Sequence, residues 1–137
     1  ATTYRMPLDR IEQGFDTLVA TAASRGAEVV VVEIADGVFQ QETRAILKSS
    51  RIRDRLDGIL FAAPDALSAL GGVTVLERDG LSPFAISGMV SCSPMAAAEA
   101  AAITSCPILS REDLWSTEKI EAHVVPLMRD KPVDVAA

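Results

Sequence analysis

The sequence predicts an α/β fold, a three-layer sandwich in which helices cover both faces of a mostly parallel sheet of about four or five strands. Short apolar runs alternate along the chain with segments of helical spacing, as in parallel sheets, where a crossover helix joins successive strands. The first run is β-branched and lacks polar alternation, which is typical of a strand covered on both faces. The expected strands lie near 29–34, 58–62, 84–90 and 107–109.

Two helices are predicted in the first half of the chain. Apolar residues recur at helical spacing over 11–23, with Asp9 as a candidate N-cap and Gly26 as a stop. A second helix is expected over 40–56, between the first two strands. These helices are the crossovers that the sandwich requires.

The segment after the second strand predicts a short helix over 65–70, which begins at Pro64 and Asp65. Residues 73–77 fit either a continued helix or a short strand, and we favour a helix interrupted at Gly71 and Gly72. This region therefore carries the crossover between the strands near 58–62 and 84–90.

Capping residues define the last helices. Ser93 and Pro94 open an alanine-rich helix that runs to Thr104. Ser110 has Asp113 three residues later, in the manner of a capping box. Helical spacing then continues over 117–128 in spite of an internal proline, and residues 130–137 are expected to form a loose tail.

Composition limits the classes of function. The 137 residues fit a single domain, and no stretch approaches the roughly 20 apolar residues that a membrane span needs. The formal net charge of −6 disfavours nucleic acid as a partner, because like charge repels phosphate. Cys92 and Cys106 lack zinc-site spacing, and the chain does not begin with a secretion signal. We therefore expect a cytoplasmic protein with free thiols.

Acidic residues follow the first expected strand. Glu33 and Asp36 lie where that strand ends, and carboxylates at a strand end are suited to hold a Mg²⁺ ion bound to phosphate, as in a Walker B motif. A simpler interpretation is that Glu33 reaches solvent or pairs with an arginine. We take both residues as candidate metal ligands.

Polar residues open the next expected helix. Asp36 and Gly37 form the turn, and Gln40 and Gln41 stand at the helix start, where backbone amides can receive an anion. The alternative is ordinary polarity at a helix N-terminus. The four residues are candidate ligand-binding residues.

The order of these segments resembles the C-terminal half of P-loop enzymes of the dethiobiotin synthetase and cobyrinic acid diamide synthase kind, over about residues 10–115. It rests on four sequence segments, Glu33 to Gly37, Asp57 to Ala62, Ile86 to Val90 and Cys106 to Leu109. In that family a strand ends in a Glu-Gly-Ala-Gly-Gly motif whose glutamate binds magnesium. The resemblance implies that Glu33 is this glutamate and Gly37 the last glycine.

The same resemblance implies further contacts to a nucleotide. Ser91 and Ser93 fall near the loop that contacts the base, and Pro107 with Leu109 matches a Pro-x-Leu segment. The implied ligands are Mg²⁺ with ATP or GTP, or a small phosphorylated metabolite. The chain would be the C-terminal part of a longer nucleotide-binding protein.

The chain departs from the family in the loop that grips phosphate. Ile34 and Asp36 replace glycines, and no G-x-x-x-x-G-K-[S/T] sequence is present. We expect no nucleotide hydrolysis by the chain alone, and a partner segment carrying a P-loop would be needed. The alternative is a non-catalytic structural domain that forms homo-oligomers, through an open sheet edge or the alanine-rich helix.

Overall fold

The computed structural model describes residues 5–129, and the chain divides into two compact units, Ala1–Leu56 and Asp57–Ala137. Each unit is described by itself. Within residues 5–129, no helix combines the length and the apolar character that crossing a bilayer requires.

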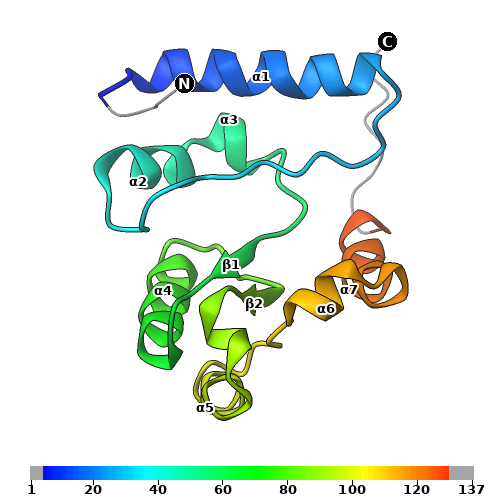
Figure 1. Ribbon diagram of the computed structural model, residues 1–137. Coiled ribbons are helices and arrows are strands. Elements are labelled where there is room, and N and C mark those ends of the chain that lie inside the picture. Colours follow the sequence, from blue (N-terminus) through cyan, green and yellow to red (C-terminus); the bar gives the residue numbers. More distant parts are fainter. Residues whose placement is uncertain (1–4, 130–137) are drawn as a thin grey trace. The chain divides into compact units, whose positions relative to one another are not determined.

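The first unit consists of helices and a long connecting segment (Figure 1). Its helices are α1 (Leu8–Ser24), α2 (Gln41–Lys48) and α3 (Ser50–Arg53). The helix predicted over 11–23 is confirmed as α1. The one predicted over 40–56 divides at Ser49, which takes an extended conformation and caps α3 by accepting a hydrogen bond from the Ile52 amide.

Polar contacts hold α1 to α3 and the residues on either side of it. Ser49 donates a hydrogen bond to Glu12 at 2.5 Å. Asp16 forms ion pairs with Arg51 and Arg55, and the Arg55 guanidinium lies 5.4 Å from the centre of the Phe15 ring. Few side chains are buried in this unit, namely Thr43, Ile46, Leu47, Ser49 and Ile52.

The strand predicted near 29–34 does not form among the described residues. The segment runs between α1 and α2 as a drawn-out coil (Figure 1). No hydrogen bond between described residues uses its backbone, and Val31 is 91% exposed. β-branched residues favour extended backbone, but a strand also needs a neighbouring strand to pair with.

The second unit contains the only strand pair among the described residues. β1 (Leu60–Ala62) and β2 (Ala85–Ser87) are parallel, with Phe61 opposite Ile86. The strand predicted near 107–109 is reduced to a single bridge between Ile86 and Ile108. The predicted segments 58–62 and 84–90 are therefore confirmed as strands only over shorter lengths.

Helices make up the rest of this unit. They are α4 (Ala66–Arg78), the 3-10 helix η1 (Met89–Cys92), α5 (Pro94–Thr104), α6 (Arg111–Trp115) and α7 (Thr117–Arg129). The two short helices predicted around Gly71 and Gly72 are one continuous helix, α4. The helices predicted over 94–104 and 117–128 are confirmed.

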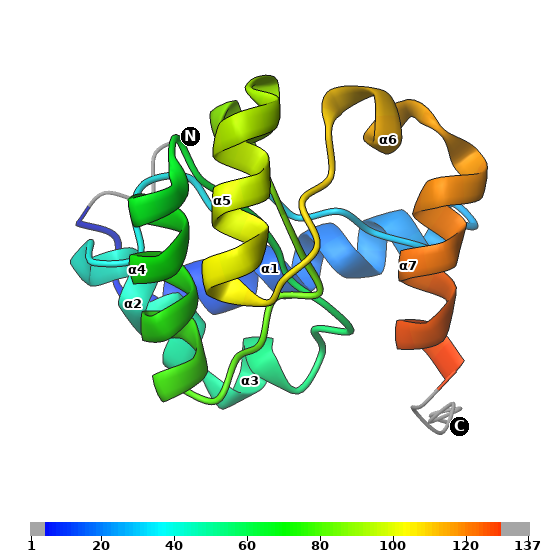
Figure 2. The same ribbon diagram turned by 90° about the horizontal axis from the view of Figure 1, so that it is seen from below.

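The α4 and α5 helices lie side by side on one face of the strand pair (Figure 2). Small side chains allow this close approach: Ala69 and Ala100 are fully buried between them and the strands, together with Ile86 and Val90. Phe61 covers Gly72 of α4 so closely that a Cβ atom there would collide with the ring.

The predicted fold class is therefore wrong. The described chain is mostly helical, with one two-stranded parallel sheet in place of four or five strands, and it lacks a three-layer sandwich with helices on both faces. The sequence pattern identified strand-forming segments, but within the described residues only those joined by α4 form a strand pair, and the segment near 107–109 adds a single bridge. The tail predicted over 130–137 lies outside the described residues.

Candidate functional site

The predicted metal and phosphate residues of the first unit gather in one turn. Asp36 has a left-handed backbone, with φ of 71°, which aspartate tolerates better than most residues. The Gln40 amide donates to the Gly37 carbonyl at 2.9 Å and closes the turn. Glu33 precedes this turn and is exposed. Asp36 therefore lies at the turn that leads into α2, and Glu33 lies three residues before it in the chain.

A buried threonine fixes this turn against α2. The Thr43 hydroxyl lies 3.3 Å from the Ala35 carbonyl oxygen and 3.1 Å from the Gln40 side-chain oxygen, and Thr43 is buried. Sequence analysis did not single out Thr43. A hydroxyl three residues after Gln40, the residue before the helix, is the only signal that the sequence offered.

The start of α2 differs from the starts of α4, α5 and α6, which have side-chain caps. Among the described residues, no side chain caps the N-terminus of α2, and the first intrahelical bond runs from the Arg44 amide to the Gln40 carbonyl. The amides of Gln41, Glu42 and Thr43 precede that bond. Such amides are the groups that bind anions at helix N-termini.

The two carboxylates fit a magnesium ion only in part. Mg²⁺ takes six oxygen ligands and is usually held by one or two carboxylates together with water and phosphate oxygens. Glu33 and Asp36 can supply two oxygens from the protein. Within residues 5–129 no group of three or more histidine, cysteine or acidic residues could hold a metal ion, so bound phosphate and water would have to complete the coordination.

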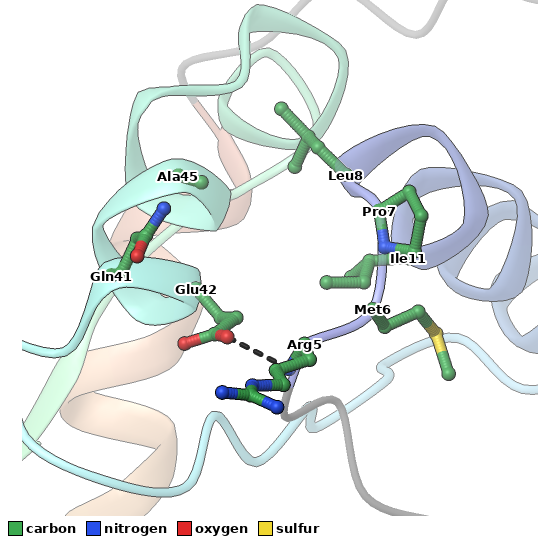
Figure 3. A pocket seen from close by; sticks show the side chains of 8 residues that line it. All are labelled: Arg5, Met6, Pro7, Leu8, Ile11, Gln41, Glu42 and Ala45. Atoms are coloured by element: carbon green, nitrogen blue, oxygen red, sulfur yellow. Dashed lines mark hydrogen bonds between the residues drawn. The ribbon is translucent and has the colours of Figure 1, made fainter.

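A pocket of about 360 Å³ opens between the beginnings of α1 and α2 (Figure 3). One wall is apolar, and the other carries Gln41 and Glu42. The backbone amide of Arg5 donates to the Glu42 carboxylate at 2.8 Å. Of the predicted residues only Gln41 lines this pocket. The pocket residues that sequence analysis missed are Arg5, Met6, Pro7, Leu8, Ile11, Glu42 and Ala45.

The predicted serines lie in the second unit and are engaged in their own turns. Ser91 donates to the Gly88 carbonyl at 2.7 Å, and Ser93 caps α5 by accepting from the Ala96 amide at 3.4 Å. Gly88 has φ of 94°, and a Cβ atom there would lie 2.8 Å from the Ala63 carbonyl oxygen. These hydroxyls shape the loop after β2.

The helices α4, α5 and α6 all begin at one edge of the second unit (Figure 2), and their first amides are already occupied. Asp65 caps α4 by accepting from the Ser68 amide at 2.7 Å, which lowers the pKa of the Asp65 carboxyl. Ser110 and Asp113 form the predicted capping box of α6. Because side chains already accept hydrogen bonds from amides in the first turns of these helices, this edge is less suited to bind an anion than the start of α2.

Comparison with known proteins gives no further guide. The chain matches no known family, no curated protein and no solved structure. The resemblance to P-loop enzymes therefore remains a prediction.

Proposed function

We propose that this chain is a nucleotide- or phosphometabolite-binding domain of the P-loop NTPase-like type, which binds its ligand through Mg²⁺ and is inactive alone. The observation that carries the proposal is the start of α2, which has no side-chain cap among the described residues and follows the turn that holds Asp36.

The electrostatics of this turn make magnesium part of the proposal. Free helical amides attract phosphate, whereas the carboxylates of Glu33 and Asp36 repel it. A divalent cation between the carboxylates and the phosphate turns this repulsion into attraction. Phosphate binding at the start of α2 should therefore depend on Mg²⁺.

Nucleotide hydrolysis requires a glycine-rich phosphate loop, which this sequence does not contain. Its three lysines, Lys48, Lys119 and Lys131, do not belong to a glycine-rich phosphate loop. That loop and its lysine hold the β- and γ-phosphates in P-loop enzymes. We propose that a separate P-loop segment supplies them, and that the protein works in the cytoplasm with ATP, GTP or a smaller phosphorylated metabolite.

Calorimetry with Mg-ATP, Mg-GTP and small phosphorylated metabolites tests the proposal. We expect binding in the millimolar range or tighter that disappears when magnesium is chelated. Glu33→Gln and Asp36→Asn should each weaken it, and asparagine keeps the left-handed backbone accessible at position 36.

Glu28→Gln is the matched control, because Glu28 is an exposed carboxylate that precedes the turn. It should bind as the original chain does. Absence of heat down to millimolar affinity, or binding that survives both substitutions at the turn, would refute the proposal.

A second candidate function is that of a non-catalytic assembly domain. The valines at 29–32 favour it, because they are between 39% and 91% exposed and a run of exposed apolar residues commonly marks an interaction surface.

A further inference from the structure

A continuous stretch of backbone in the first unit has hydrogen-bonding capacity that the described residues leave unused. The Ala27 amide donates to the Ala22 carbonyl, and the Ala35 carbonyl accepts from Thr43. Between these two bonds, no hydrogen bond among residues 5–129 uses the backbone of residues 28–34. This stretch, which we call the open segment, has Val31 at its centre.

The open segment also lacks most of the features that usually prevent strands from pairing. It contains no proline, glycine or lysine, and its sequence is Glu-Val-Val-Val-Val-Glu-Ile. Exposed β-branched segments of this length favour pairing with another strand, and edge strands are normally protected by such interrupting residues. Its only charges are those of Glu28 and Glu33.

These charges select the direction of pairing between two copies. In a parallel pair in register, each glutamate would lie beside the same glutamate of the other copy, about 4.8 Å away. A symmetric antiparallel pair centred on Val31 places Glu33 opposite Val29 and Glu28 opposite Ile34. The two Glu33 side chains are then offset by four residues, roughly 14 Å, which exceeds the screening length of about 8 Å at physiological salt. Glu28 of the other copy is one residue away from the Val29 opposite Glu33, but its side chain points to the opposite face of the pair.

Symmetry and the flanking hydrogen bonds select the register. A two-fold axis perpendicular to an antiparallel pair must place one residue directly opposite its own copy. Centring the pair on Val30 would place Glu33 opposite Ala27, and centring it on Val32 would place Val29 opposite Ala35, and both alanines already form hydrogen bonds within the unit. Only the register centred on Val31 pairs the whole open segment and nothing else.

We infer that a second copy of this chain pairs antiparallel with the open segment, residues 28–34, about a two-fold axis at Val31. This inference deepens the second candidate function, because it names the partner and the surface of assembly. Val31 is the most exposed of the four valines, and in the dimer it packs against its own copy.

Disulfide trapping tests the register. Cα atoms directly opposite in an antiparallel pair lie about 4.5–5.5 Å apart, within the range that a disulfide spans. In a Cys92→Ser background, which removes the exposed native thiol, Val31→Cys should yield a covalent dimer under mild oxidation. Val29→Cys should not, because residue 29 and its copy are offset by four residues.

Light scattering without nucleotide tests the association itself. We expect a dimer at high micromolar concentration and a monomer after Val31→Pro, which removes an amide from the ladder, with the helical circular dichroism unchanged. A wild-type monomer, or equal cross-linking at positions 29 and 31, would overturn the inference. Neither result bears on Mg-nucleotide binding, which calorimetry measures separately.

Discussion

Two segments that the sequence predicts as strands have different fates in this molecule. Residues 29–34 remain an unpaired coil, whereas the shorter β2 forms the centre of a small sheet. Val31 is 91% exposed, and Ile86 is fully buried. The difference shows that β-branched composition favours an extended backbone, but a neighbouring strand decides whether the segment becomes part of a core.

The connection between segments explains which of them finds a neighbour. The α4 helix joins β1 to β2 and packs on the pair, so that one βαβ unit builds its own core. Residues 29–34 have only helices next to them in the first unit. Substitutions in the paired strands should therefore change the stability of the chain more than substitutions in the open segment.

The largest expected contrast is between Ile86→Ala and Val31→Ala. Removing the buried Ile86 side chain should lower the free energy of unfolding by roughly 2–5 kcal/mol. At concentrations where the chain is monomeric, Val31→Ala should change it by less than about 0.5 kcal/mol, as for an exposed site. Urea denaturation of both variants measures the difference, and equal effects would contradict it.

The loops that follow the two segments should differ in the same way. Gly88→Ala forces a side chain into a backbone conformation that favours glycine, against the Ala63 carbonyl, and should cost roughly 2–4 kcal/mol. Gly37 follows the open segment, and a Cβ atom there meets nothing within 4 Å. Gly37→Ala is the control, and thermal unfolding should show little change or a small gain in stability.

Two adjacent glycines in α4 should also differ in how their substitution changes stability. Gly72→Ala places a methyl group against the Phe61 ring, whereas Gly71→Ala meets nothing within 4 Å. Overpacking costs about 1–3 kcal/mol, and alanine in a helix gains about 1 kcal/mol over glycine. Gly71→Ala should therefore stabilise the chain, and Gly72→Ala should be the less stable of the two. Chemical denaturation curves of the two variants measure the order, and equal stability would show that the Phe61 ring moves aside.

The smallest expected effect is a pH dependence at the junction of α6 and α7. Hydrogen bonds from Lys119 and from Ser110 lower the pKa of Asp113 to about 2. Because this folded-state pKa lies below the ordinary value of 3.8, the stabilisation is present above pH 4 and is lost as the pH falls towards 2.

Fluorescence of Trp115, the single tryptophan, reports on this junction. Asp113→Asn should weaken the junction at neutral pH and remove its contribution to the acid dependence. Glu112→Gln, at the exposed neighbouring position, should behave like the original chain. An unchanged acid transition in Asp113→Asn would show that other groups control it.

Sequence analysis predicted helices better than strands, because the signals of helices are local. Asp65, Ser93 and Ser110 each act as the cap that their positions indicated, and α7 continues through Pro126. Strand pairing depends on contacts between distant residues, so the run at 29–34 was indistinguishable from a buried strand. Gly71 and Gly72 suggested a break, but Phe61 packs on α4 at that point and the helix continues.

The candidate site was predictable only as a local motif. Asp36, Gly37 and Gln40 do lie at a turn before a helix, and Gln41 begins that helix, as their spacing indicated. The role of Thr43 depends on tertiary burial, and the pocket beside Glu42 depends on Arg5, which is 37 residues away in the chain. Contacts of this kind leave no periodic signal in the sequence.

The long coil between α1 and α2 has a practical consequence. A protease cleaves a substrate that it can bind in a drawn-out form, and exposed connecting segments are preferred sites of nicking. The carboxyl side of Val31, with its side chain 91% exposed, is therefore where an elastase-type enzyme should cut first. Such a cut would break the covalent link between α1 and α2 and leave α1 held only by non-covalent contacts, such as those of Asp16 with Arg51 and Arg55.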